Sequence, residues 1–178
     1  MKRKLHGALL AGALAFAASA HAELPTWKDW SVGAANDGTG VYAATSNETG
    51  SIFGQTCSFN GNCEYRLLTA TTCRPDAVYP GLVTTEHGAT SVSLVCRSGG
   101  ESGHHVFAIA PFADIDSLAK KASRMGIVIP TESDRFHVMR FSMMGASAAV
   151  GFMRDSVARK LDSEPGPQSV RAPRDTWL

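Results

Sequence analysis

Residues 51–68 read SIFGQTCSFNGNCEYRLL, and this stretch decides the fold class. Two runs rich in β-branched and aromatic residues flank residues 58–62, a five-residue segment that contains an Asn-Gly pair. Runs of this kind on either side of turn residues predict a β-hairpin. Cys57 and Cys63 stand where the two predicted strands meet the turn.

The register of this hairpin has two solutions. A two-residue turn at Asn60-Gly61 would place Cys57 opposite Glu64, on the other face of the sheet from Cys63. A five-residue loop would instead place the two cysteines opposite each other.

The chain has four cysteines, at Cys57, Cys63, Cys73 and Cys96. An even number in an oxidising compartment indicates two disulfides, and four cysteines allow three connectivities. The local turn favours Cys57–Cys63 together with Cys73–Cys96. There is no Cys-x-x-Cys and the spacings match no common zinc knuckle, so we expect structural cysteines, no metal site and no cofactor.

Further short runs extend the strand pattern to about seven to nine strands. The clearest are residues 41–45, 82–85, 91–96 and 106–110. Residues 86–89 predict a hairpin turn, and in the strand that follows Val92, Leu94 and Cys96 should share a buried face. Pro75 and Pro80 predict a loop in place of a central strand.

The pattern changes at Asp114. Residues 114–125 begin with acids, end with bases and precede Gly126, which predicts a helix. Two strands follow at residues 127–129 and 136–141, and a second helix should span about residues 145–161. Its inner face is predicted to carry Ala146, Ala149, Val150, Met153 and Val157.

These elements predict an α+β fold: a β-rich single domain over residues 23–161, stapled by disulfides. It would be a twisted antiparallel sheet or partial barrel with two helices in the C-terminal third. Residues 162–178, rich in proline and scattered charges, predict a disordered tail.

The first 22 residues have the pattern of a signal peptide. A cationic start, an apolar run and small residues at Ala20 and Ala22 predict cleavage before Glu23. The apolar run is too short to span a bilayer, and no second run of about 18 apolar residues follows, so we expect no membrane span.

Removal of the first 22 residues would leave 156 of the 178, with 14 basic and 16 acidic side chains. This charge balance is not that of a nucleic-acid-binding protein. The expected location is the periplasm, or outside the cell.

No catalytic residue is predicted. His104 and His105 are adjacent, so on a strand they would point to opposite faces and not easily share one ion. There is no Gly-x-Ser-x-Gly elbow for a serine nucleophile. Asp114 and Asp116 are explained as helix-start residues. The alternative is an envelope hydrolase or metal-dependent enzyme that uses His104 or His105.

The segment from Asp114 to Ala149 carries a resemblance. A helix ending in Lys120-Lys121, then Phe136-His137-Val138, then residues 140–149 (RFSMMGASAA) resemble uncharacterised exported proteins of Gram-negative bacteria. More distantly, the segment is similar to the invasion-associated locus B family of small secreted β-rich proteins. The resemblance implies an exported, non-enzymatic protein linked to the envelope or to host interaction, and it assigns no site residue.

We therefore expect a protein-binding module without catalytic activity, such as an inhibitor, an immunity protein or an envelope or host-interaction factor. Rigid sheets commonly bind through their loops. The predicted binding surfaces are the turn with Asn60 and Asn62, and the loop with Glu101, His104 and His105. Trp27 and Trp30 are expected in packing. Trp177, in the predicted tail, is expected to be a loose end, with a docking role as the alternative.

Overall fold

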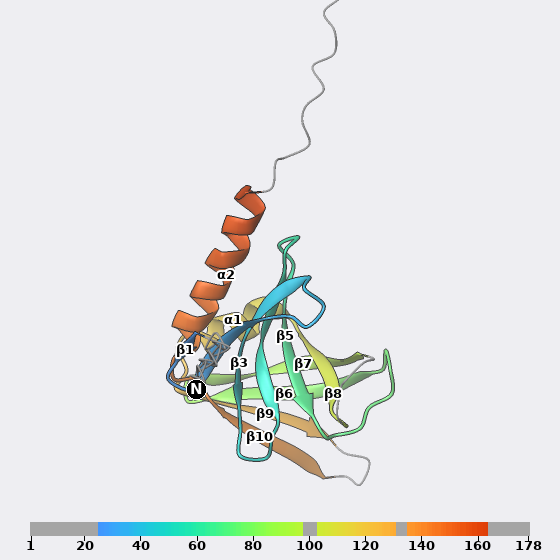
Figure 1. Cartoon of the computed structure of the whole chain (residues 1–178). Coiled ribbons are helices and arrows are strands. Elements are labelled where there is room, and N and C mark those ends of the chain that lie inside the picture. Colours follow the sequence, from blue (N-terminus) through green and yellow to red (C-terminus); the bar gives the residue numbers. More distant parts are fainter. Residues whose placement is uncertain (1–24, 98–102, 131–134, 164–178) are drawn as a thin grey trace, which may run out of the picture.

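The computed structural model describes residues 25–97, 103–130 and 135–163 (Figure 1). Its strands are β1 Thr26–Trp27, β2 Trp30–Ala34, β3 Gly40–Ser46, β4 Ile52–Ser58, β5 Cys63–Thr69, β6 Val78–Thr85, β7 Gly88–Arg97, β8 His105–Ala110, β9 Arg124–Pro130 and β10 Phe136–Ser142. Its helices are α1 Phe112–Ala119 and α2 Ala146–Ser163. The β-rich α+β prediction is confirmed. The predicted signal peptide, Glu101 and Trp177 lie outside the described residues.

All ten strands join one antiparallel sheet in the order β1-β2-β3-β4-β5-β8-β7-β6-β9-β10. The sheet curls so that strands far apart in this order come into contact. The rings of Phe53 in β4 and Phe141 in β10, for example, lie 5.6 Å apart, centroid to centroid. At the same end the Trp30 indole donates to the Ser142 carbonyl at 2.9 Å. Helix α2 packs on β1 to β4, away from β9 and β10 (Figure 1). Neither described helix is long and apolar enough to cross a membrane.

The hairpin of β4 and β5 adopts the five-residue alternative. Cys57 stands opposite Cys63, and the Ser58 amide donates to the Asn62 carbonyl at 2.9 Å. Gly61 takes a φ of 89°, a left-handed conformation that glycine adopts without a Cβ penalty. Both predicted disulfides are present, Cys57–Cys63 and Cys73–Cys96.

The structure confirms two predicted buried faces, one on β7 and one on α2. The face of β7 that carries Val92, Leu94 and Cys96 is buried. The five residues predicted for the inner side of the second helix are the buried residues of α2. That helix runs to Ser163, two residues past its predicted end, so Asp162 and Ser163 belong to it and not to a tail.

The first helix is shorter than its pattern predicted. It ends at Ala119, and Met125 and Gly126 belong to β9. The segment between α1 and β9 is bound by the hairpin turn between β6 and β7, where the Glu86 carboxylate accepts hydrogen bonds from the amides of Ser123 and Arg124. Met125, 1% exposed, sits in the sheet opposite Phe141, so tertiary pairing overrides the local helix pattern.

Pro80 was expected in a loop and lies in β6, opposite Ser93 of β7. Strand β9 pairs with β6 from Leu82 onward, opposite Val128. The same register would set Pro80 against Pro130, where neither residue has an N–H to donate. The proline therefore stands where β6 has a neighbour on one side, which is where a strand tolerates it.

Glu86 gives the fold an acid-sensitive contact. Amide hydrogen bonds from Ser123, and more weakly from Arg124, lower the pKa of its carboxyl to about 2. A pKa lower in the folded than in the unfolded chain stabilises the fold above about pH 4.3. That contribution is lost as the pH falls toward 2. We expect Glu86→Gln to flatten the fall in unfolding free energy over this window, measured by urea denaturation. Glu48→Gln, in the exposed turn after β3, is the control, and an equal flattening there would contradict the assignment.

Candidate functional site

The predicted binding residues do not form one surface. Asn60 and Asn62 lie in the turn before β5, where the Asn60 side-chain oxygen accepts the Asn62 amide at 3.0 Å. His105 begins β8 and pairs with Thr69 at the other end of β5, with His104 just before it. Strand β5 therefore separates the asparagines from the histidines.

His104 and His105 were also the basis of the enzyme alternative. Within residues 25–97, 103–130 and 135–163, no three His, Cys, Asp or Glu side chains gather in a way that could hold a metal ion. Among the described histidines, His137 Nδ1 lies 2.9 Å from the Thr71 hydroxyl and His87 Nε2 lies 3.0 Å from the Lys121 carbonyl; neither contact involves His104 or His105. The described structure thus adds no catalytic partner to His104 or His105.

A polar cluster that the sequence analysis missed lies between the two helices and the sheet. This Asp116 cluster consists of Gln55, Tyr65, Asp116, Lys120 and Arg154. One carboxylate oxygen of Asp116 accepts the Tyr65 hydroxyl at 2.9 Å and an Arg154 nitrogen at 2.5 Å. The other pairs with the Lys120 ammonium at 2.8 Å. The cluster therefore ties α1, α2 and β5 together.

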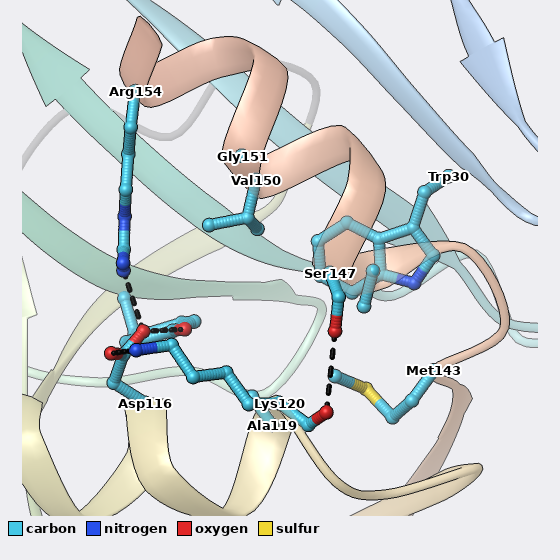
Figure 2. A pocket seen from close by; sticks show the side chains of 11 residues that line it. Trp30, Asp116, Ala119, Lys120, Met143, Ser147, Val150, Gly151 and Arg154 are labelled. Atoms are coloured by element: carbon cyan, nitrogen blue, oxygen red, sulfur yellow. Dashed lines mark hydrogen bonds and ion pairs between the residues drawn. The ribbon is translucent and has the colours of Figure 1, made fainter.

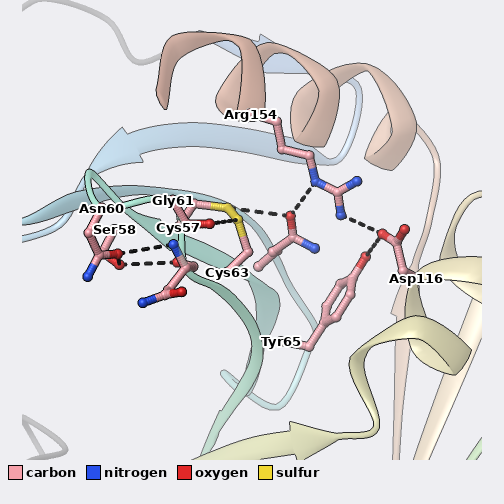
Figure 3. Close-up of a disulfide and its surroundings, with 10 residues drawn as sticks. Cys57, Ser58, Asn60, Gly61, Cys63, Tyr65, Asp116 and Arg154 are labelled. Atoms are coloured by element: carbon pink, nitrogen blue, oxygen red, sulfur yellow. Dashed lines mark hydrogen bonds and ion pairs between the residues drawn. A yellow bond between two sulfur atoms is a disulfide. The ribbon is translucent and has the colours of Figure 1, made fainter. Parts of the chain in front are cut away.

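Figure 3 shows how this cluster joins the first disulfide. The Arg154 Nε donates to Gln55 Oε1 at 2.8 Å, and Cys57 Sγ lies 3.7 Å from the same oxygen. The sulfur is disulfide-bonded and carries no hydrogen, so the second approach is a contact only. Gln55 is fully buried, and among the described residues its Nε2 has no hydrogen-bond partner.

The surroundings of Asp116 and Tyr65 keep both groups in their ordinary charge states. Burial raises the pKa of Asp116, but hydrogen bonds from Arg154, Lys120 and Tyr65 outweigh it and leave the pKa lowered. Burial, and then the negative charge of Asp116, raise the pKa of the Tyr65 hydroxyl well above its usual range. At neutral pH Asp116 is ionised and Tyr65 is a neutral donor.

A cavity of about 280 Å³ lies beside the cluster, under the first turns of α2 (Figure 2). Its walls are largely apolar, with Trp30, Met143 and Val150 among them. The Ser147 hydroxyl, also at the wall, donates to the Lys120 carbonyl at 3.2 Å. Asp116 pairs with two cations, which leaves these three groups with a net positive charge, and the Ser147 hydroxyl donates to a backbone carbonyl and not to a general base. The cluster is best explained as an anchor for the helices.

Sequence spacing gave one clue to the cluster. Asp116 and Lys120 are four residues apart, a spacing at which helical side chains meet. Asp114 is exposed in the first turn, as predicted for a helix-start residue, whereas Asp116 is 9% exposed. The partners Tyr65 and Arg154 come from distant elements, and no local pattern identifies them.

A second candidate surface is the edge of the sheet at β10. Within the described residues this strand pairs with β9 and with no other strand. The Met143 amide donates to the Ser123 carbonyl of the β9 side at 2.9 Å, which fixes the alternation of the ladder. Residues 137, 139 and 141 then bond to β9, and the N–H and C=O groups of Phe136, Val138 and Arg140 point away from the sheet.

The outer face next to this edge is apolar. Phe136 and Val138 are 70% and 40% exposed, and they stand opposite Pro130 and Val128 of β9. Val128 in turn stands opposite Leu82 of β6, and the Leu82 side chain is 37% exposed. We call these five residues the β10 outer face. Paired residues of an antiparallel sheet share a face, so they form one continuous surface. The two helices make their main contacts elsewhere: α2 with β1 to β4, α1 with β5 and β7.

Cationic groups border one end of this surface. Arg140, on the same face two residues after Val138, lines an open hollow of about 430 Å³ together with Arg124. Within the described chain neither guanidinium forms an ion pair. The nearby carboxylates are engaged with other groups: Glu86 with backbone amides and Asp29 with the Ser142 hydroxyl at 2.5 Å.

Comparison with known proteins identifies the fold and nothing finer. No family model and no curated protein matches the sequence. Among solved structures, the chain is similar to the crystal structure of invasion associated protein B from Bartonella henselae, with a TM-score of 0.56 and 10% sequence identity. The match covers 77% of this chain and 99% of that one. The similarity expected from residues 114–149 is therefore present at the level of the fold.

Proposed function

We propose that this chain is an exported protein-binding module without catalytic activity, which holds its partner at the β10 outer face. The observation that carries the proposal is the exposed apolar surface beside a strand edge that no described strand pairs with. Monomeric proteins rarely expose large contiguous apolar patches, and such patches commonly mark interaction sites. An inhibitor, an immunity protein or an envelope or host-interaction factor would each use such a surface.

Two further observations support export. The chain begins with a signal-peptide pattern, and the four cysteines form two disulfides, a state typical of oxidising compartments. The fold shared with an invasion associated protein is consistent with a periplasmic or secreted location. The predicted surfaces at Asn60, Asn62, Glu101, His104 and His105 remain candidates for additional contacts.

The proposal is tested by capture in intact cells. Tagged protein is treated with a crosslinker that does not cross the inner membrane, and the products are identified by mass spectrometry. We expect one dominant partner with the wild-type protein. Phe136→Asp should reduce its recovery at least about tenfold, as for a central apolar contact. Phe136 is 70% exposed, so the substitution should leave folding intact.

Leu161→Asp is the matched control, because Leu161 is an exposed apolar residue on α2, 40% exposed. It should leave the recovery unchanged. A partner recovered equally with Phe136→Asp, or no crosslinked partner at all, would overturn the proposal.

A further inference from the structure

The geometry of β10 points to a particular kind of partner, and the inference rests on the proposed function. We propose that the partner adds an extended strand to the β10 edge and that this strand carries an acidic residue followed at alternate positions by two apolar ones. In the antiparallel orientation, the acidic residue lies opposite Arg140 and the apolar residues lie opposite Val138 and Phe136. This is strand addition to an exposed sheet edge.

The backbone supplies the docking groups. Because residues 137, 139 and 141 bond to β9, Phe136, Val138 and Arg140 present three N–H and three C=O groups to the free edge. The next residue of the same set, Ser142, has its carbonyl taken by the Trp30 indole. The edge open to a partner therefore runs from Phe136 to Arg140 and ends where the sheet curls toward β2.

The side chains of the same three residues supply the specificity. They lie on the outer face, and a residue placed directly opposite each of them would project from that face too. Among the described residues, Phe136 and Val138 have no apolar cover and Arg140 has no carboxylate partner. Arg124 lies across the adjoining hollow and adds a second unpaired guanidinium. A carboxylate opposite Arg140 would lie beside an unpaired guanidinium, with a second one at the same hollow.

A second copy of this chain complements the edge less well. In a symmetric antiparallel pairing centred on Val138, each Arg140 would face a Phe136, and the described residues of β10 would bring no carboxylate to the four guanidinium groups. A pairing centred on Arg140 would set two like charges opposite each other, which is destabilising. Charge complementarity thus favours an acidic strand.

The probe is the synthetic peptide Thr-Glu-Thr-Val-Thr-Val-Thr, added at millimolar concentration to isotopically labelled mature protein. We expect slowed amide hydrogen exchange at Phe136, Val138 and Arg140. N-methylation of the two valines removes donors that face β10 and should abolish the protection. N-methylation of the threonines between the glutamate and the second valine, whose amides face away, is the matched control and should preserve it.

Charge specificity is tested by exchange of partners. Arg140→Glu should weaken binding of the acidic peptide about tenfold and favour the peptide with lysine in place of glutamate. Protection that is insensitive to valine N-methylation, or equal binding of both peptides to both proteins, would overturn the inference.

The outcomes separate the inference from the proposed function. If cellular capture depends on Phe136 but no edge amide is protected by the peptide, the partner binds the outer face without strand addition, and the inference fails alone. If addition of the peptide produces self-association instead of edge protection, the second copy is the occupant and the inference also fails.

Discussion

Replacing Asp116 with alanine is expected to lower the free energy of unfolding by about 2–3 kcal/mol. The substitution leaves the Arg154 guanidinium and the Tyr65 hydroxyl without their shared acceptor beneath α2. Breaking a fully buried ion pair costs about 3–5 kcal/mol. The expected loss is smaller, because the Lys120 and Arg154 side chains are 59% and 31% exposed and solvent screens them.

Urea denaturation of both proteins measures this loss. Asp155→Ala is the matched control, since Asp155 is an exposed acid on α2, one residue from Arg154, and it should change the free energy by less than about 0.5 kcal/mol. A loss for Asp116→Ala no larger than that of the control would show that the cluster is not the anchor of the helices.

The difference in unfolding free energy between the wild type and Asp116→Ala should be smaller at acidic pH. The pKa of Asp116 is lowered in the folded state, so its contribution is present above the unfolded value of about 3.9 and disappears as the pH falls through the folded value. The stability difference between wild type and Asp116→Ala should therefore shrink below about pH 4. A difference that grows in acid would contradict the assigned direction of the pKa change.

Removing the Cys73–Cys96 disulfide should destabilise the protein more than removing Cys57–Cys63. The sequence separations are 23 and 6 residues, and chain entropy gives about 3.4 and about 2.2 kcal/mol respectively. The longer bridge ties the connection before β6 to β7. The shorter one joins two strands that the hairpin already pairs.

Double alanine variants of each pair, compared by urea denaturation, measure this order. Both variants remove one buried half-cystine, at Cys96 or at Cys57, so the packing loss is similar in the two. A greater loss for the Cys57 and Cys63 variant would contradict the loop-length account.

The parts of the fold that were predictable depend on short-range patterns. Alternation identified the buried face of β7, and helical spacing identified the five inner residues of α2. The disulfides could be inferred because one pair spans a single turn. The register of that turn was open, and the structure selects the longer loop that sets Cys57 opposite Cys63.

The features that the sequence analysis predicted wrongly or could not predict depend on contacts between distant segments. The pattern of residues 114–125 is helical, yet the helix ends at Ala119. Glu86 accepts the Ser123 amide and Met125 pairs with Phe141, so Arg124 and Met125 join β9. The strand order could not be predicted from the sequence, so the position of β10 at the edge of the sheet could not be predicted either. The sequence predicted a strand at residues 136–141, but it could not show that this strand lies at an edge of the sheet.

The most direct test of the account is residue-by-residue amide hydrogen exchange along β10 in the protein without any added partner. The open edge predicts slow exchange at residues 137, 139 and 141, which bond to β9, and fast exchange at Phe136, Val138 and Arg140. Slow exchange at all six residues would mean that the edge is already covered, and would contradict the claim that β10 is free to receive a partner.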